Sequence, residues 1–545
     1  MNPLRTLLIS VIALSMAAAA GGRDAPLDVL ITGGIVIDGS GAPRRIADVG
    51  IRDGKIVAVG DLKQSQSRSV LDVRGLVVAP GFIDVHNHVP EAVPRLSGPL
   101  INEAFLTQGV TTLIGGPDGG LAPAQIAAIV KKLERDGSSE NYAFYVGHNG
   151  IRRQVMGLDR RAATGDEIEK MKTLVREGME MGCVGFSTGL MYEPGLFSAP
   201  DEVVALAREV QPYGGTYDTH TRNPVFDLLG SDREAIEIGK QAGISTKIGH
   251  IKPVGLVNKG RSADEIALVE QARAAGQDVV TDQYPYDGAA LRTLDALIVI
   301  PGMANDTRGL DTEIVRAALR DPARRLAIKI ASEQGIDGGF AWIKSVGYGS
   351  LRIVHAPDDP RIVGKNIELF AAERRMEPFD LLAELILTHA SPISTTLGAL
   401  EESDLRAELA MPWNMISSDG QYLDPQSKSP LHPRYTGSFP RVLGHYVRDV
   451  RLFPLEEAVR KMTSLPAEHL HLAGRGRIEI GYAADITVFN AQRVRDRSTW
   501  ADPAALSEGI EHVLVNGVTV LSHGKPTGVT PGSFLPREAA RRRPM

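Results

Sequence analysis

The fold is decided by one stretch of sequence, Ala79-Pro80-Gly81-Phe82-Ile83-Asp84-Val85-His86-Asn87-His88. An apolar run typical of a buried strand ends there in two histidines spaced two residues apart. Residues i and i+2 of a strand point to the same side, so His86 and His88 can reach one metal ion. The alternative is two ordinary polar residues at a strand end. The stretch therefore predicts a buried strand whose carboxyl end carries candidate ligands.

The chain beyond this stretch alternates short apolar runs with amphipathic helical patterns, as a parallel sheet with crossover helices requires. The candidate strands are Val77–His86, Thr111–Gly115, Tyr142–Gly147, Val184–Ser187, Thr216–Thr219, Thr246–Ile251, Asp278–Asp282 and Met415–Ser418. The candidate helices include Ala122–Arg135, Gly165–Met181, Pro200–Val210, Asp232–Ala242, Ser262–Ala275 and Leu455–Thr463. About eight such repeats predict an α/β fold, a (β/α)8 TIM-like barrel. A doubly wound open sheet is the alternative.

Segments rich in short β patterns flank this centre on both sides. We expect residues 26–78 and 476–525 to pair into one small β-sandwich domain and residues 79–475 to form the barrel. Residues 289–375 are longer than a strand-to-helix connection needs, which predicts an inserted subdomain or lid. Residues 526–545 are interpreted as a tail, with the arginines at 541–543 in solvent.

Composition limits the possible function. The chain has 545 residues, 60 basic and 66 acidic side chains, a net charge of −6, thirteen histidines and one cysteine. The charge provides no basic field that would attract phosphates, so no nucleic-acid partner is expected. One cysteine can form neither an internal disulfide nor a multi-cysteine zinc site. Any metal site must therefore be built from histidines and carboxylates.

The first twenty residues have the pattern of a secretory signal peptide. Arg5 precedes an apolar stretch, Leu7–Ala20, which ends in four alanines. The stretch is shorter than the roughly 20 residues of a membrane span. We expect an exported, periplasmic protein that begins near Gly21 and is not stably inserted in a membrane after cleavage. An uncleaved anchor or a disordered leader is the alternative.

Three further polar residues follow strand-like runs. His220 ends Thr216-Tyr217-Asp218-Thr219-His220, His250 follows Ile248-Gly249, and Asp419 follows Ile416-Ser417-Ser418. A single histidine at such a position is more often a hydrogen-bond partner, and an Asp before Gly is common in turns. Barrel strands deliver their carboxyl ends to one shared face, however, so these residues can converge. There Asp419 could carry protons beside a metal-activated water.

These motifs resemble the amidohydrolase superfamily, and most closely its N-acyl-D-amino-acid deacylase branch, the D-aminoacylases. Beside the strand at 79–88, the resemblance is carried by Gly185–Leu190, His148-Asn149-Gly150, His250-Ile251-Lys252, Tyr284-Pro285-Tyr286, His432-Pro433-Arg434, Phe439–Gly444, Met462–Ala467 and Gly476–Asp485. It covers nearly all of the chain after the leader. It implies a metal-dependent hydrolase barrel that binds one or two zinc ions and cleaves the amide bond of small N-acyl-D-amino acids.

The resemblance also implies roles for individual residues. His220 and His250 correspond to ligands of the principal zinc, and His86, His88 and Asp419 correspond to a neighbouring metal position. Asp419 also matches the catalytic acid and base. Lys252, Tyr284 and Arg434 match positions that hold the α-carboxylate of the substrate, a task that suits Lys and Arg. Without the family context, surface charges and a core tyrosine would be the simpler interpretation of these three.

One position departs from the family pattern. The family has a metal-binding Cys in a Gly-Asn-Cys-Gly turn after the second strand, whereas the corresponding stretch here is Gly115-Gly116-Pro117-Asp118-Gly119-Gly120. The cysteine of this chain, Cys183, lies elsewhere and is interpreted as a small buried residue. Asp is an anionic oxygen ligand, harder than a thiolate, that can still bind zinc. We therefore hypothesise that Asp118 is a metal ligand; a turn Asp is the alternative.

Other functions on the same barrel remain open at this stage. Enzymes of this superfamily that hydrolyse cyclic amides or dipeptides often bridge two metals with a carboxylated Lys or a Glu, and Lys252 keeps that question open. An exported binding protein or pseudoenzyme is the non-enzymatic alternative, favoured by the departure at Asp118 and opposed by the four histidines and Asp419. Acyl-chain preference, side-chain preference and oligomeric state have no signature in this sequence.

Overall fold

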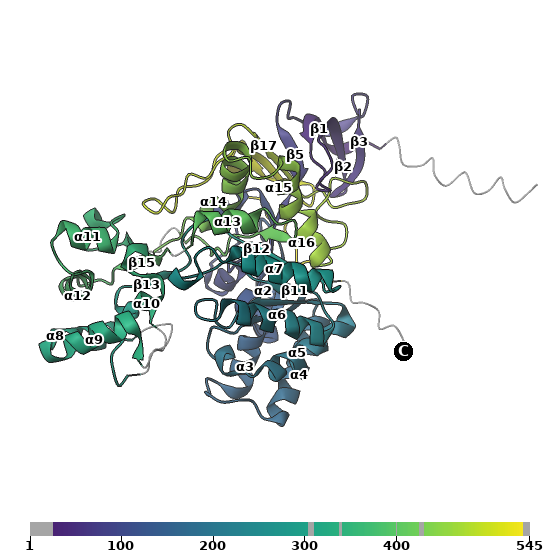
Figure 1. Ribbon diagram of the computed structural model, residues 1–545. Helices are drawn as coiled ribbons and strands as arrows, with labels where there is room; N and C mark the ends of the chain where they lie inside the picture. The colour runs from purple at the N-terminus through teal and green to yellow at the C-terminus, as the bar shows by residue number, and fades with distance from the viewer. Residues whose placement is uncertain (1–24, 304–309, 337–340, 399, 425–429, 538–545) are drawn as a thin grey trace, which may run out of the picture.

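The computed structural model describes residues 25–303, 310–336, 341–398, 400–424 and 430–537. Its strands form one sheet of nine strands, one of eight and one of three (Figure 1). The expected signal peptide at 1–20 and the arginines at 541–543 lie outside the described residues. No helix in the described part of the chain is long and apolar enough to cross a membrane.

The eight-stranded sheet is a nearly closed parallel barrel. Its strands are β6 (Phe82–Asp84), β7 (Val110–Gly115), β8 (Asn141–Gly147), β9 (Gly185–Gly189), β10 (Thr216–His220), β11 (Thr246–Ile248), β12 (Val279–Gln283) and β16 (Asn414–Ile416). Just beyond β6 and β16, the N–H of Asp419 donates to the carbonyl of His86 at 2.9 Å, and the N–H of His88 donates to the carbonyl of Gly420 at 2.7 Å. These bonds join the first and last strands. The (β/α)8 prediction is confirmed, and the doubly wound sheet is wrong.

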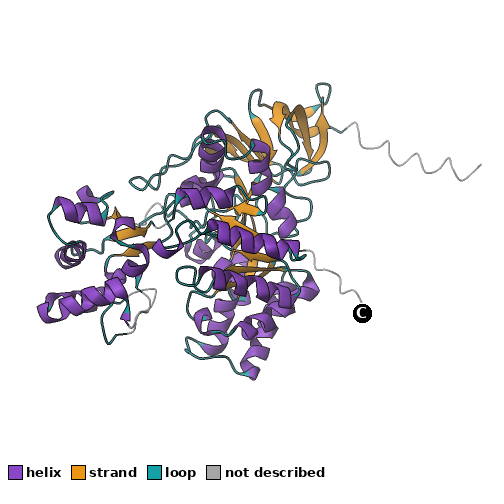
Figure 2. Cartoon of the chain, viewed as in Figure 1, coloured by secondary structure: helices purple, strands orange, loops and turns teal. Residues whose placement is uncertain are grey.

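Helices surround the barrel strands (Figure 2). They are α2 (Pro123–Asp136), α4 (Gly165–Glu180), α5 (Pro200–Ala207), α6 (Leu228–Ala242), α7 (Ser262–Ala274), α13 (Glu402–Leu409) and α15 (Leu455–Met462). Helix α4 shows why they form. Thr164 caps its first turn with Glu167 in a capping box, and Met171, Val175 and Met179 form a buried stripe at helical spacing.

The nine-stranded sheet combines both ends of the described chain. Strands β1 (Leu27–Val36), β2 (Arg45–Arg52), β3 (Lys55–Gly60), β4 (Ser67–Asp72) and β5 (Val77–Pro80) come from one end, and β17 (Ile486–Phe489), β18 (Ile510–Val515), β19 (Val518–Ser522) and β20 (Lys525–Pro526) from the other. Strands β5 and β17 pair antiparallel, with Val78 opposite Val488. The two β-rich ends of the sequence therefore share one sheet.

Gly81 marks the passage from this sheet to the barrel. Its N–H donates to the carbonyl of Asp485 at 2.8 Å, and a Cβ at this position would lie 2.2 Å from Oγ1 of Thr111. Only glycine fits such a close approach. The run expected as one strand, Val77–His86, is therefore divided between two sheets, and the barrel starts at 82 instead of 79.

An inserted subdomain separates β12 from β16. Strands β13 (Leu291–Thr293), β14 (Leu351–His355) and β15 (Ser394–Leu397) form its antiparallel sheet. Helices α8 (Thr312–Arg320), α9 (Pro322–Gln334), α10 (Trp342–Val346), α11 (Ile367–Glu373) and α12 (Pro378–Thr388) accompany the sheet, and the unit projects beside the barrel (Figure 1). The boundary expected at 375 is wrong, because β15 pairs with both β13 and β14.

The segment after β20 follows the barrel as far as the described chain reaches. The N–H of Tyr142 donates to the carbonyl of Ser533 at 3.0 Å, the N–H of Leu535 donates to Tyr142 at 2.8 Å, and the N–H of Arg537 donates to Gly182 at 2.9 Å. The part of the expected tail up to residue 537 is thus bound to the barrel.

Candidate active site

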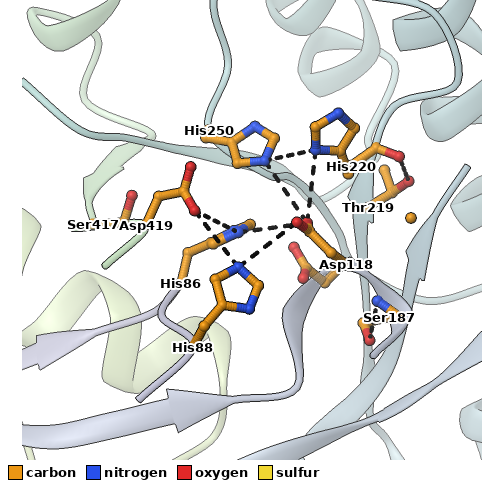
Figure 3. Close-up of polar contacts among 12 residues, drawn as sticks. His86, His88, Asp118, Ser187, Thr219, His220, His250, Ser417 and Asp419 are labelled. Atoms are coloured by element: carbon orange, nitrogen blue, oxygen red, sulfur yellow. Dashed lines mark hydrogen bonds and ion pairs between the residues drawn. The ribbon is translucent and has the colours of Figure 1, made fainter. Parts of the chain in front are cut away.

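Six side chains that the sequence nominates as ligands meet at the carboxyl ends of the barrel strands: His86, His88, Asp118, His220, His250 and Asp419 (Figure 3). The carboxylate of Asp118 lies at their centre. Its Oδ1 is 3.5 Å from Nε2 of His86, 3.8 Å from Nδ1 of His220 and 3.7 Å from Nε2 of His250. Its Oδ2 is 3.8 Å from Nε2 of His88. The turn after β7 therefore brings Asp118 to all four histidines.

The donor atoms fit a metal ion. In three groups, His86–His250–Asp419, His86–His88–Asp118 and Asp118–His220–His250, one donor atom from each residue lies within 4.8 Å of the others. Both ring nitrogens of His86 and Oδ1 of Asp118 are buried and have no hydrogen-bond partner among the described residues. Buried polar atoms rarely lack a partner, and imidazole nitrogens with carboxylate oxygens are a zinc donor set.

The protonation states of His220, His250 and Asp118 suit metal binding. Burial lowers the pKa of His250 to about 4 and that of His220 well below its ordinary value, so both rings are neutral near pH 7. A neutral imidazole is the form that binds metal. Burial opposes the charge on Asp118, but the histidines around it hold the pKa of its carboxyl well below its usual range. Asp118 is therefore an anion.

Three of the candidate ligands have left-handed backbone. The φ angles are 56° at Asp118, 38° at His250 and 44° at Asp419. This conformation is uncommon for residues other than glycine and costs on the order of 1–3 kcal/mol, so it persists only where the surroundings enforce it. The bonds of Asp419 and His88 to the opposite strand are part of that enforcement. The strained backbone marks this end of the barrel as functional.

Lys252, Tyr284 and Arg434 lie together beside the ligand cluster, as the sequence predicts. The Nζ of Lys252 is 5.0 Å and the Cζ of Arg434 4.5 Å from the ring centroid of Tyr284. Nη1 of Arg434 lies 2.9 Å from Oδ2 of Asp419 and also donates to the carbonyl of Ala289 at 2.9 Å. All three line a cavity of about 450 Å³ together with Asp118, His220 and Asp419.

A buried charge cluster under the histidines was missed by sequence reasoning. Nζ of Lys247 lies 2.8 Å from Oδ1 of Asp218 and donates to Asp282. The Oδ1 of Asp282 accepts from the N–H of His250 at 3.1 Å, and its Oδ2 is 3.8 Å from Nδ1 of His86. Through Asp282, the cluster thus contacts two candidate ligands, His250 and His86. Its one sequence signal is the presence of charged residues inside apolar strand patterns.

Cys183 takes no part in the site. It is fully buried in the same apolar cluster as Val175 and Met179, and burial raises the pKa of its thiol to about 12. The interpretation of Cys183 as a small core residue is therefore correct.

Comparison with known proteins agrees with this geometry. A model described as "Amidohydrolase family" matches residues 394–521. The D-aminoacylase of Alcaligenes xylosoxydans xylosoxydans is 34% identical over 94% of this chain and 99% of its own. The N-acyl-D-glutamate deacylase of the same organism is also 34% identical, over 94% of this chain and 97% of its own.

A solved structure matches the fold over the same extent. The N-acyl-D-glutamate deacylase of Bordetella bronchiseptica, solved with zinc and a phosphonate that mimics the tetrahedral intermediate, superimposes with a TM-score of 0.74 and 32% identity. The match covers 94% of this chain and 100% of that one. The chain therefore belongs to the D-aminoacylase family of amidohydrolases.

Proposed function

We propose that this protein is a zinc-dependent hydrolase that cleaves the amide bond of N-acyl-D-amino acids, releasing a carboxylate and a free D-amino acid. One observation carries the proposal. The histidine and aspartate cluster and the group formed by Lys252, Tyr284 and Arg434 line the same cavity. A metal centre next to a carboxylate-binding group is what this reaction needs. The zinc-containing relative with a phosphonate inhibitor supports the same chemistry.

The metal would be held by residues already close enough to share it. Asp118, His220 and His250 form one donor group, and His86 and His88 with Asp118 form a second, reached also by Asp419. One or two ions fit this arrangement. Zinc, when bound, supplies a Lewis acid that polarises the acyl carbonyl and lowers the pKa of water to about 7.

Asp419 is positioned to move protons. It lies between the histidines and the substrate-binding group, 3.6 Å from Nε2 of His88 and 2.9 Å from Nη1 of Arg434. Burial opposes its charge, yet Arg434 and His88 keep the pKa of its carboxyl well below the ordinary value, so it is a base at neutral pH. Asp419 accepts the proton of the attacking water and delivers it to the leaving nitrogen.

Lys252, Tyr284 and Arg434 bind the α-carboxylate. The guanidinium of Arg434 offers parallel N–H donors that match a carboxylate, and Lys252 adds a second positive charge. The Nε of Arg434 is buried and has no hydrogen-bond partner among the described residues, so a donor is available to a ligand. Fixing the α-carboxylate orients the scissile amide toward the metal centre.

Hydrolysis of cyclic amides or dipeptides is less well supported. A carboxylated lysine would have to stand between the two donor groups, where Asp118 lies instead. Nζ of Lys252 donates to the carbonyl of His250 at 2.7 Å, and Lys247 is engaged by Asp218 and Asp282. The non-enzymatic alternative is opposed by the retained donor set, since pure binding of a solute has no need of it.

Release of free amine from N-acetyl-D-methionine and from N-acetyl-D-glutamate, assayed separately, tests the proposal. The protein is stripped with a chelator, dialysed and reconstituted with zinc. We expect no release from the stripped protein and restored release after one or two equivalents of zinc per chain. Equal rates before and after stripping would refute metal dependence, and the absence of release in both states would refute the hydrolase.

We also propose that the chain is exported to the periplasm. The support is the pattern of residues 1–20, a basic start and a short apolar core that ends in small residues. Fractionation of cells that produce the full chain, with sequencing of its amino terminus, tests this proposal. A start near Gly21 in the periplasmic fraction is expected, and an intact Met1 in the cytoplasm would contradict it.

A further inference from the structure

Arg292 is a cation in the active-site cavity that the described residues leave without a carboxylate. It lies on β13 of the inserted subdomain and lines the same cavity as Asp118 and Asp419. Its Nη1 donates to the carbonyl of Leu291 at 2.9 Å. Its Nε is buried and has no hydrogen-bond partner among the described residues.

The guanidinium of Arg292 has a cation–π contact with an aromatic ring. Cζ of Arg292 lies 5.4 Å from the centroid of the Trp342 ring, which also lines the cavity. A cation over an aromatic face is stabilised without losing its in-plane N–H donors. The contact therefore stabilises the charge and uses none of the N–H donors that a ligand would need.

Lys252 and Arg434, which line the same cavity, differ from Arg292 in the partners that the protein gives them. Arg434 is paired with Asp419, with Nη1 and Oδ2 2.9 Å apart, and Lys252 donates to the carbonyl of His250. Burial lowers the pKa of Arg292, whereas Asp419 outweighs burial and raises the pKa of Arg434. The ionisable neighbour that acts most on Arg292 is the hydroxyl of Tyr192, which carries no charge at neutral pH.

Arg292 is partly exposed, but its Nε is buried, and a buried charged donor without a partner is costly. A ligand carboxylate would remove that cost with two parallel charged hydrogen bonds. We propose that Arg292 binds a second carboxylate of the substrate, distinct from the α-carboxylate, so that the preferred N-acyl-D-amino acids are dicarboxylates. This inference rests on the proposed function, because it assigns the α-carboxylate to Lys252, Tyr284 and Arg434.

The second carboxylate has two chemical sources: the side chain of the amino acid or the acyl group. Two pairs of substrates separate them, N-acetyl-D-glutamate against N-acetyl-D-glutamine, and N-succinyl-D-alanine against the neutral amide of its succinyl group. The members of each pair have the same shape and differ in charge. The pair with the larger ratio of kcat/KM, acid over amide, identifies the source.

Three variants test the role of Arg292. Arg292→Met removes the charge and keeps an apolar contact with Trp342, and Arg292→Lys keeps the charge without the fork of donors. Arg352→Met is the matched control, because Arg352 lies on β14 of the same three-stranded sheet and does not line the active-site cavity. We expect the wild-type acid-to-amide ratio to be at least about tenfold, and Arg292→Met to lower it by about 10- to 100-fold.

Under this proposal, Arg292→Lys has an intermediate ratio and Arg352→Met has the wild-type ratio. A wild-type ratio near one for both pairs, or an equal loss on acid and amide in Arg292→Met, would overturn the proposal. Failure of the proposed function gives a different result, no hydrolysis of any of the four compounds. In that case calorimetry on the zinc-loaded protein decides: tighter binding of an acid than of its amide, lost in Arg292→Met, supports the second-carboxylate site, and equal binding rejects it.

Discussion

The carboxylate of Asp118 and the imidazole of His86 face each other at the carboxyl end of the barrel, with Oδ1 and Nε2 3.5 Å apart. Asp118 stands where the family pattern has a metal-binding cysteine, and it contacts both halves of the ligand cluster. Under the hypothesis that Asp118 is a metal ligand, a hard anionic donor takes the place of the soft thiolate that the family resemblance implies.

Substitution of Asp118 should weaken metal binding. Asp118→Ala removes the anion that faces all four histidines, so zinc content per chain and affinity should both fall. Asp118→Cys should retain zinc, because a thiolate is also a zinc ligand. Elemental analysis with competitive chelation measures both quantities, and Asp159→Ala, an exposed residue, is the control. Unchanged stoichiometry and affinity in Asp118→Ala would refute the ligand role.

Substitution of Asp419 should slow the chemical step. Asp419→Asn keeps the shape and loses the base, so kcat should fall by about 10²–10⁴-fold, the typical contribution of a positioned acid–base group. Zinc content is measured on the same sample, because Asp419 also lies in a metal-donor group. Near-normal turnover in a zinc-loaded Asp419→Asn enzyme is the result that this role does not allow.

Arg434 should be needed for substrates that carry an α-carboxylate. Arg434→Met should lower kcat/KM for N-acetyl-D-methionine by about 10- to 100-fold, the cost of losing charged hydrogen bonds. For the α-amide of the same substrate, the kcat/KM of the wild-type enzyme should be lower than for the acid by a similar factor. Arg434→Met should lower kcat/KM for this amide much less than it does for the acid. Parallel losses on acid and amide would mean that Arg434 acts through structure, for example through its pair with Asp419.

Glu140 makes stability depend on pH. Burial raises the pKa of its carboxyl from 4.5 to about 8. Between pH 4.5 and about 8, the folded state therefore holds a proton that the unfolded state releases. The contribution of this proton to folding stability is fully present below pH 4.5 and is lost as pH rises through 8. Glu140→Gln, neutral at every pH, should gain stability over wild type from pH 5 to pH 9. Thermal unfolding at both values measures the gain, with Glu134→Gln on the exposed face of α2 as the control. A pH-independent difference would contradict the account.

The barrel and the meeting of the candidate ligands at one end of it were predictable because their signals are local. Each apolar run that ends in His or Asp predicts a strand with that residue at its carboxyl end. Parallel strands place those ends together. The position of Asp118 depended on family resemblance, since an Asp in a glycine-rich turn has no distinctive pattern of its own. The structure places it at the centre of the cluster.

The features that the sequence did not predict depend on contacts between residues that lie far apart in the chain. The contact of Lys247 with Asp218 and Asp282 joins three strands, and no spacing along the chain encodes it. Strand β15, Ser394–Leu397, has three polar residues among its four, so no apolar run predicts it. The inserted subdomain therefore extends beyond the expected end at residue 375. The place of Arg292 in the cavity depends on that same strand pairing.

Hydrolysis of paired enantiomers tests whether this protein is a zinc-dependent deacylase of N-acyl-D-amino acids. Zinc-loaded enzyme is assayed for amine release on N-acetyl-D- and N-acetyl-L-amino acids that share a side chain, with the chelated protein as the blank. We expect release from the D enantiomers that depends on zinc, at rates at least about 100-fold above those for the L enantiomers, which corresponds to about 2.7 kcal/mol of discrimination. Equal rates on both enantiomers, or release that persists without metal, would contradict the proposed function.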